Sequence, residues 1–231
     1  GVGMLLFVNV FRLAWQPFFL ETSEQEDARA IFARVLTYFL LITSGVFLAI
    51  SLYIDDLVRL QIGSHTFFGS AFWAGTDLVP LFLGAYILYG LYVNLVAGVY
   101  IEKKTISLPP IPGAAALTSV GANLILIPHM GMQGAAVASI LGYAAMVIGL
   151  YLLTKRYYPI PYEWSRLIKI VLIAGGIFTL GFLPEIDTSW IFKTCIILLY
   201  PVLLMATRFF NTEEVDFIKR RLGVGAQRKN G

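Results

Sequence analysis

Residues 78–101 read LVPLFLGAYILYGLYVNLVAGVYI, a run of 24 residues without a charged side chain. Because a helix needs about 20 mostly apolar residues to cross the hydrocarbon core of a bilayer, this run predicts a transmembrane helix. It is about twice as long as a strand of a membrane β-barrel, and its apolar residues do not alternate, which disfavours a barrel. Stretches of the same kind recur along the rest of the chain.

The composition of the whole chain agrees with this interpretation. Of its 231 residues, 58% are hydrophobic and 13% are charged, and the mean hydropathy is +0.77. A soluble domain has about 25% charged residues. The composition therefore excludes a water-soluble, disordered or disulfide-rich protein and predicts an all-α, polytopic membrane protein.

About seven runs are long and apolar enough to span the membrane, and they predict a transmembrane helix bundle. The sixth is the shortest and is rich in glycine. The predicted spans are Gly1–Leu20, Val35–Ile54, Leu78–Ile101, Ile106–Pro128, Gly131–Leu153, Leu167–Leu183 and Trp190–Phe210. The transmembrane region would thus cover residues 1–210, and residues 211–231 would form a basic tail.

Lysine and arginine are distributed unevenly between the two sides that these spans define. Arg59 and Lys193 fall on one side, and Arg12 lies within the first span. The other fourteen of the seventeen share the opposite side: Arg29, Arg34, Lys103, Lys104, Lys155, Arg156, Arg166, Lys169, Arg208, Lys219, Arg220, Arg221, Arg228 and Lys229. Because cytoplasmic loops carry an excess of both residue types, the carboxyl-terminal tail is predicted to be cytoplasmic and the amino end outside. An outside amino end that starts directly in an apolar run leads us to expect the carboxyl-terminal part of a longer membrane protein.

The sequence carries no motif of catalytic or metal-binding chemistry. Cys195 is the one cysteine, and His65 and His129 lie in separate predicted loops, so no spacing typical of a metal site occurs. There is no phosphate-binding P-loop, no Gly-x-Ser-x-Gly and no His-Glu-x-x-His. We therefore expect no enzyme activity, no catalytic residue, no metal and no cofactor. Topology accounts for the net charge of +3, so we expect no nucleic-acid partner.

Arg12 is the most informative residue within a predicted span. A charge at the centre of a transmembrane helix costs at least about 2.5–3.5 kcal/mol, so it needs a use or a partner. Asn9, Arg12 and Gln16 are spaced three and four residues apart, which places them on one helix face. No Asp or Glu lies in the interior of any predicted span. Either Arg12 is a cation that faces a cavity, or carbonyl groups or another part of the protein satisfy its charge.

Other polar side chains within the spans are candidates for a substrate pathway. These are Tyr89 and Asn94 of the third span, where Tyr86 and Gly90 share the helix face of Asn94, and Asn123 of the fourth span. Each could instead hydrogen-bond a neighbouring helix, which is common in membranes.

Small residues form a stripe along the fifth span. They are Gly134, Ala138, Gly142, Ala145 and Gly149. Such a stripe allows another helix to approach closely, so it predicts a helix–helix contact.

Three stretches together resemble the carboxyl-terminal half of polysaccharide flippases of the multidrug/oligosaccharidyl-lipid/polysaccharide exporter superfamily. The first is Ala14-Trp15-Gln16-Pro17-Phe18, which is followed by an acidic loop. The second runs from Asn123 through Pro128 and Gly131 into Gly-Ala-Ala-Val-Ala-Ser at 134–139, and it is the most specific of the three. The third is the aromatic segment 157–164, with basic residues after it.

The resemblance implies both an architecture and a function. Flippases of this family have fourteen helices in two six-helix lobes and a final pair, so this chain would match helices eight to fourteen and pair with an amino-terminal lobe of the same protein. They move undecaprenyl-pyrophosphate-linked oligosaccharides across the cytoplasmic membrane by alternating access. Arg12 matches a position in the eighth helix and would be the cation of the cavity. Asparagine, glutamine and tyrosine side chains would hydrogen-bond the sugar hydroxyls.

Other functions stay open at this level. A cation-coupled multidrug exporter shares the superfamily fold but typically uses carboxylates within the membrane, which these spans lack. A lipid II flippase differs in its cargo. A membrane-embedded sugar transferase or ligase is less favoured, because Asp55, Asp56, His65 and Asp77 are its only candidate residues and no motif connects them.

Overall fold

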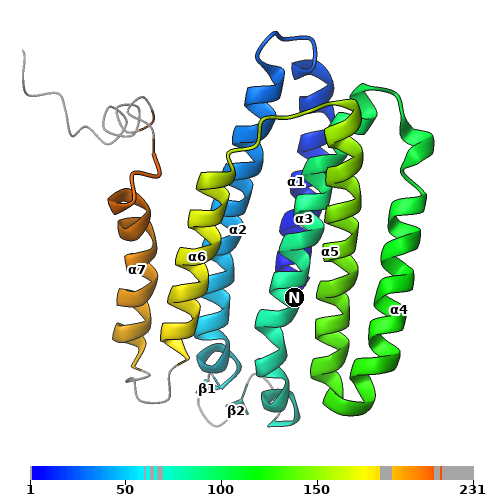
Figure 1. Cartoon of the computed structure of the whole chain (residues 1–231). Coiled ribbons are helices and arrows are strands. Elements are labelled where there is room, and N and C mark those ends of the chain that lie inside the picture. The colour runs from blue at the N-terminus through cyan, green and yellow to red at the C-terminus, as the bar shows by residue number, and fades with distance from the viewer. Residues whose placement is uncertain are drawn as a thin grey trace, which may run out of the picture. The chain divides into compact units, whose positions relative to one another are not determined.

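The computed structural model describes residues 2–59, 61–62, 65–66, 70–182, 189–210 and 214, and these form a helical protein. Within them the chain has seven α-helices (Figure 1): α1 (Val2–Thr22), α2 (Ala28–Val58), α3 (Val79–Ile101), α4 (Pro110–Met130), α5 (Met132–Tyr157), α6 (Trp164–Gly181) and α7 (Trp190–Ala206). Six of them, α1 to α6, are long and apolar enough to cross a membrane, and α7 is a shorter apolar helix of 17 residues. The predicted fold class, a bundle of transmembrane helices, is confirmed.

Short non-helical and 3₁₀ segments connect some of the helices. Between α2 and α3 lie β1 (Gln61–Ile62) and β2 (His65–Thr66), which pair antiparallel with Gln61 opposite Thr66, and then the 3₁₀ helix η1 (Ser70–Leu78). A second 3₁₀ helix, η2 (Thr105–Ser107), precedes α4. The predicted basic tail, residues 211–231, lies outside the described residues apart from Glu214.

Two helices begin at other residues than the spans predicted for them. The predicted span Val35–Ile54 lies within the longer helix α2, which begins at Ala28 because Arg29 and Arg34 continue the helix beyond its apolar run. The predicted span Ile106–Pro128 lies within the apolar stretch Thr105–Met130, while helix α4 itself begins at Pro110. Proline lacks the backbone N–H and is favoured in the first turn of a helix, where that group has no partner.

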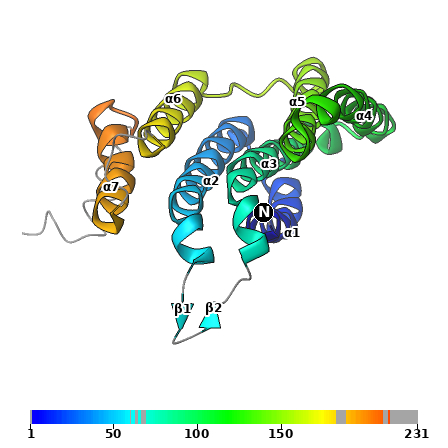
Figure 2. The same cartoon turned by 90° about the horizontal axis from the view of Figure 1, so that it is seen from below.

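The chain divides into two compact units, Gly1–Trp164 and Ser165–Gly231. In the first unit α3 packs against α1, α2 and α5, and α4 packs against α5. Figure 2, which views these helices end-on, shows α1, α3, α5 and α4 following one another in space. The order along the chain is therefore not the order in the bundle, since α5 separates α4 from α3.

An aromatic core holds α1 against α2 and α3. Trp15 of α1 contacts Phe32 of α2 edge-on with 5.7 Å between ring centroids, and Phe11 contacts Phe39 at 4.7 Å. The buried members of this core are Val8, Trp15, Phe19, Ala28, Phe32, Phe39, Val93, Ala97 and Tyr158. Those on α1 recur at Val8, Trp15 and Phe19, which defines one buried helix face. The core therefore fixes the rotation of α1 about its own axis.

The small-residue stripe of α5 packs against α4, as the sequence predicted. A Cβ atom at Gly134 would lie 2.5 Å from the Leu126 carbonyl oxygen, and one at Gly142 would lie 2.9 Å from Cβ of Ser119. Gly131, with φ of +56°, forms the tight turn between the two helices and adopts a conformation that favours glycine. The backbones of α4 and α5 therefore approach too closely to admit larger side chains.

In the second unit, a buried arginine joins α6 to the chain that follows α7. The Arg166 guanidinium donates to both carboxylate oxygens of Glu214, at 3.3 and 3.0 Å, and lies 4.4 Å from the ring centroid of Phe209. Lys169 Nζ donates to the Thr207 carbonyl oxygen at 2.9 Å. Bidentate pairing of this kind is stronger than a single hydrogen bond between neutral groups. Together these contacts anchor Thr207, Phe209 and Glu214 to the first turns of α6.

Candidate functional site

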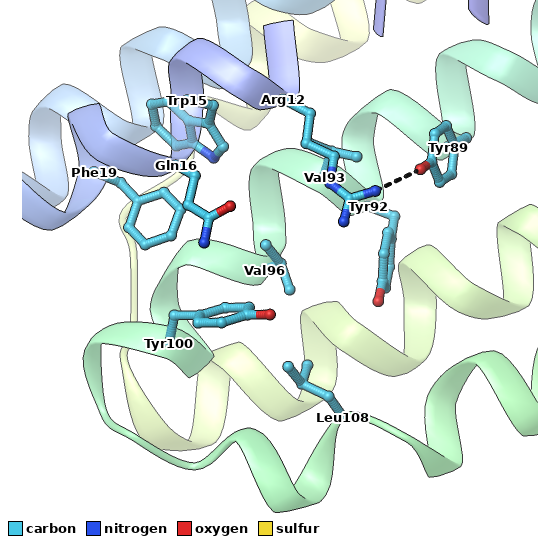
Figure 3. A pocket seen from close by; sticks show the side chains of 10 residues that line it. All are labelled: Arg12, Trp15, Gln16, Phe19, Tyr89, Tyr92, Val93, Val96, Tyr100 and Leu108. Atoms are coloured by element: carbon cyan, nitrogen blue, oxygen red, sulfur yellow. Dashed lines mark hydrogen bonds between the residues drawn. The ribbon is translucent and has the colours of Figure 1, made fainter. Parts of the chain in front are cut away.

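A pocket of about 180 Å³ lies between α1 and α3. Its lining combines one cation, one amide, an indole and three phenols with apolar side chains. The residues are Arg12, Trp15, Gln16 and Phe19 of α1, Tyr89, Tyr92, Val93, Val96 and Tyr100 of α3, and Leu108 from the segment before α4. Figure 3 shows the polar ends of Arg12, Gln16, Tyr92 and Tyr100 directed toward the same space. Two of the predicted site residues of α1 and one of α3 thus meet here.

The packing of α1 explains why Arg12 and Gln16 face the pocket. Trp15 and Phe19 are buried, with 4% and 1% of their surfaces exposed. Arg12 and Gln16 precede them by three residues each, and both are exposed. Residues three apart lie on adjoining parts of a helix surface. The aromatic core therefore holds the polar stripe of α1 at the edge of the bundle, beside α3.

The Arg12 guanidinium has most of its hydrogen-bonding capacity free. Its Nη1 donates to Tyr89 Oη at 3.5 Å, at the long end of hydrogen-bond distances. No carboxylate in the described part of the chain forms a salt bridge with it. A guanidinium has five N–H donors in a rigid planar fork, which matches the oxygens of a carboxylate or phosphate. The pocket therefore presents a cation that is ready to bind an anion.

Aromatic rings form much of the pocket wall. Tyr89 and Tyr92 stack with 6.4 Å between their centroids and 18° between their planes. The ring centroids of Phe19 on α1 and Tyr100 on α3 lie 6.1 Å apart. Trp15 Nε1 is buried and has no hydrogen-bond partner among the described residues. Rings of this kind provide faces for a sugar or an isoprenoid and, through their polar atoms, hydrogen bonds at the rim.

The other predicted site residues do not line this pocket. Asn9 is half-buried on α1, about one turn from Arg12. Asn94 is buried, and its Nδ2 donates to the Gly90 carbonyl oxygen at 2.9 Å within α3. Asn123 Nδ2 likewise donates to the Ser119 carbonyl oxygen, at 2.8 Å within α4. The amide nitrogens of Asn94 and Asn123 thus bond within their own helices, while Asn94 Oδ1 is buried without a hydrogen-bond partner among the described residues.

Sequence reasoning missed Trp15 and Tyr100 as pocket residues. A signal was nevertheless present, because Tyr89, Val93, Val96 and Tyr100 are spaced four, three and four residues apart and therefore share one face of α3. The neighbouring face with Asn94, which the sequence favours as a substrate pathway, instead packs against other helices. Gly90 of that face is packed against Phe39, whose ring a Cβ atom at this position would overlap.

Comparison with known proteins gives no assignment for this arrangement. No family model, no curated protein and no solved structure matches the chain. What the pocket does chemically has to follow from its own residues. A guanidinium, an amide and several phenols in an apolar surround suit a ligand with a compact anionic group next to hydroxyl-bearing or apolar parts.

Proposed function

We propose that this chain provides part of the binding cavity of a transporter for polyisoprenoid-pyrophosphate-linked oligosaccharides in the cytoplasmic membrane. The observation that carries the proposal is Arg12, a cation within a membrane-spanning helix that opens onto a pocket and has Tyr89 Oη as its one hydrogen-bond partner among the described residues. Inserting a charged side chain into the membrane costs free energy, and such residues typically mark a ligand site or a transport pathway. The resemblance of residues 14–18, 123–139 and 157–164 to polysaccharide flippases supports the same cargo.

Pyrophosphate is the ligand group that best fits Arg12. Its oxygens accept the paired N–H groups of a guanidinium, which neutralises one of the negative charges of the pyrophosphate in a medium where charges are poorly solvated. Gln16 and the tyrosine hydroxyls are uncharged and can hydrogen-bond an adjoining sugar. The isoprenoid chain can stay in the hydrocarbon core of the membrane. These three chemistries occur together in a lipid-linked sugar.

The size of the pocket supports the proposal that this chain contributes part of the cavity. At about 180 Å³ the pocket is smaller than the roughly 300–1,000 Å³ typical of sites for drug-sized ligands. It can hold a phosphate group and the edge of a ring but not an oligosaccharide. We therefore propose an amino-terminal lobe of the same protein as the partner that completes the cavity, with membrane lipid around it.

The pocket belongs to the half of α3 that leads to Lys103 and Lys104. The excess of lysine and arginine on that side supports a cytoplasmic location for these residues and for the segment that follows α7. In this orientation the pocket lies nearer to the cytoplasmic leaflet, from which polysaccharide flippases move their cargo outward.

Cysteine labelling is expected to confirm this orientation. In a Cys195→Ala background, Asp77→Cys should react in intact cells with a membrane-impermeant thiol reagent, and Lys104→Cys should react only after the cells are permeabilised. Both positions are exposed and lie near opposite ends of α3, so each reports one side of the membrane. The reverse pattern at both positions would place the segment after α7 outside.

A binding measurement tests the proposed cargo. In the purified protein reconstituted in nanodiscs, undecaprenyl diphosphate should bind at least about tenfold more tightly than undecaprenol, which has the same chain without phosphates. High salt should reduce the difference, because it screens a partly exposed cation. Equal affinity for the two lipids would show that the pocket does not select an anion and would overturn the proposal.

A further inference from the structure

A second pocket, of about 240 Å³, lies between α4 and α5. It belongs to the same compact unit as the Arg12 pocket. Its lining consists of Pro112, Ala115, Ala116 and Ser119 of α4 and Ser139, Gly142, Tyr143 and Met146 of α5. None of these side chains is charged, so the pocket has no group that would select an anion.

Three hydroxyl groups give this pocket its chemistry. Ser139 Oγ donates to the Ala135 carbonyl oxygen at 3.0 Å, which leaves its lone pairs available to a donor. Ser119 Oγ and Tyr143 Oη have no hydrogen-bond partner within the part of the chain that is described. The hydroxyls of Ser119 and Tyr143 can both donate and accept, and that of Ser139 can accept, which matches the hydroxyl groups of a sugar. The volume of about 240 Å³ is enough for one sugar ring.

Tyr89 connects the two pockets. Its hydroxyl accepts from Arg12 Nη1, and its ring lies 5.6 Å from that of Tyr143, centroid to centroid. Tyr143 in turn lines the second pocket. Figure 2 shows the corresponding helices side by side in the order α1, α3, α5 and α4, which agrees with their contacts. The Tyr89–Tyr143 contact therefore joins the lining of the Arg12 pocket to that of the second pocket.

We propose that the pocket between α4 and α5 binds a sugar ring of the lipid-linked oligosaccharide whose pyrophosphate binds Arg12. This inference rests on the proposed function and adds to it a separate, uncharged subsite. The charged pocket recognises a group common to all such lipids, and the hydroxyl-lined pocket recognises the glycan. The two sites then contribute to affinity in different ways, because the second one has no group to bind in a lipid that lacks a sugar.

Two lipid probes and a hydroxyl-deletion variant test the inference. The probes are undecaprenyl diphosphate and undecaprenyl-diphosphate-N-acetylglucosamine, measured in nanodiscs with the purified chain. The variant is Ser119→Ala with Tyr143→Phe, which keeps the ring next to Tyr89. We expect this variant to weaken binding of the glycosylated lipid about tenfold and to change binding of the sugar-free lipid less than twofold.

Control variants separate this inference from the proposed function. Thr118→Val removes a neighbouring hydroxyl of α4 that is exposed and donates to the Ala114 carbonyl oxygen, so neither lipid should be affected. Arg12→Ala should weaken the binding of both lipids. If the hydroxyl-deletion variant affects both lipids equally or affects neither, the sugar subsite is overturned. If Arg12→Ala affects neither lipid, the proposed pyrophosphate site fails, whatever the hydroxyl-deletion variant does.

A second variant guards against loss of folding. Ala116→Leu fills the pocket from α4, where residue 116 is exposed, without removing a hydrogen bond. It should reproduce the selective loss of the glycosylated lipid while the melting temperature stays at the wild-type value. Unchanged binding of the glycosylated lipid by this well-folded variant would contradict the subsite.

Discussion

Glutamate in place of Arg12 is expected to abolish export of surface polysaccharide in cells that depend on this protein. The new carboxylate would face the pyrophosphate of the proposed cargo in a pocket lined by tyrosines and apolar side chains. Two unit charges 4 Å apart repel by about 4 kcal/mol at an effective dielectric constant of 20, which corresponds to about a thousandfold in binding. Arg12→Ala should remove most export, because it removes the attraction without adding repulsion.

Lysine at position 12 is expected to keep part of the function. It keeps the positive charge but loses the planar fork that binds two oxygens at once. The order of export should therefore be arginine, lysine, alanine and glutamate. The measurement is cell-surface polysaccharide, normalised to the amount of the protein in the membrane.

Membrane abundance distinguishes a ligand-binding role from a structural one. Arg12→Ala should insert as well as wild type, since a costly charge has been removed from the membrane. Arg34→Ala is a matched control, because Arg34 is also exposed but lies on α2, away from the pocket. Normal export by both Arg12→Ala and Arg12→Glu would show that Arg12 does not bind the cargo. Loss of the protein itself in both variants would show that Arg12 stabilises the fold.

The helices could be predicted from the sequence because length and hydrophobicity determine whether a segment crosses a bilayer. The first residues of α2 and α4 could not be predicted in this way, because a helix does not have to begin where its apolar run begins. Arg29 and Arg34 extend α2 into the charged region, and Pro110 rather than hydrophobicity sets the start of α4. Apolar character therefore locates a span, while its boundaries depend on local backbone chemistry.

The pocket was only partly predictable. Arg12 and Gln16 stand out because charged and polar residues are rare within a span, and their spacing places them on one face. Helix α3 is apolar on nearly all sides, so its sequence does not show which face meets α1. Tyr89 faces α1, whereas Asn94 is buried and bonded within its own helix. The packing of α3 against three other helices decides which of its faces lines the pocket. The periodicity of one helix carries no information about those neighbours.

Leucine in place of Gly142 is expected to reduce the amount of folded protein severalfold. A Cβ atom at this position would already lie 2.9 Å from Cβ of Ser119 and 3.3 Å from the Ala115 carbonyl oxygen. A leucine side chain adds three further carbon atoms, which would force α4 and α5 apart. Overpacking of this kind typically costs about 1–3 kcal/mol, and a loss of 1–2 kcal/mol can change cellular abundance severalfold.

Gly121→Leu provides the matched comparison for this effect. Gly121 lies on α4, the other partner of the same helix pair, and has no atom within 4 Å of where its Cβ would be. Both variants make the same change in side chain and in helix propensity, so a difference between them reports the helix contact alone. Size-exclusion profiles and melting temperatures in detergent should be near wild type for Gly121→Leu and clearly lower for Gly142→Leu. Equal melting temperatures and profiles of the two variants would mean that the stripe on α5 does not pack against α4 in the membrane.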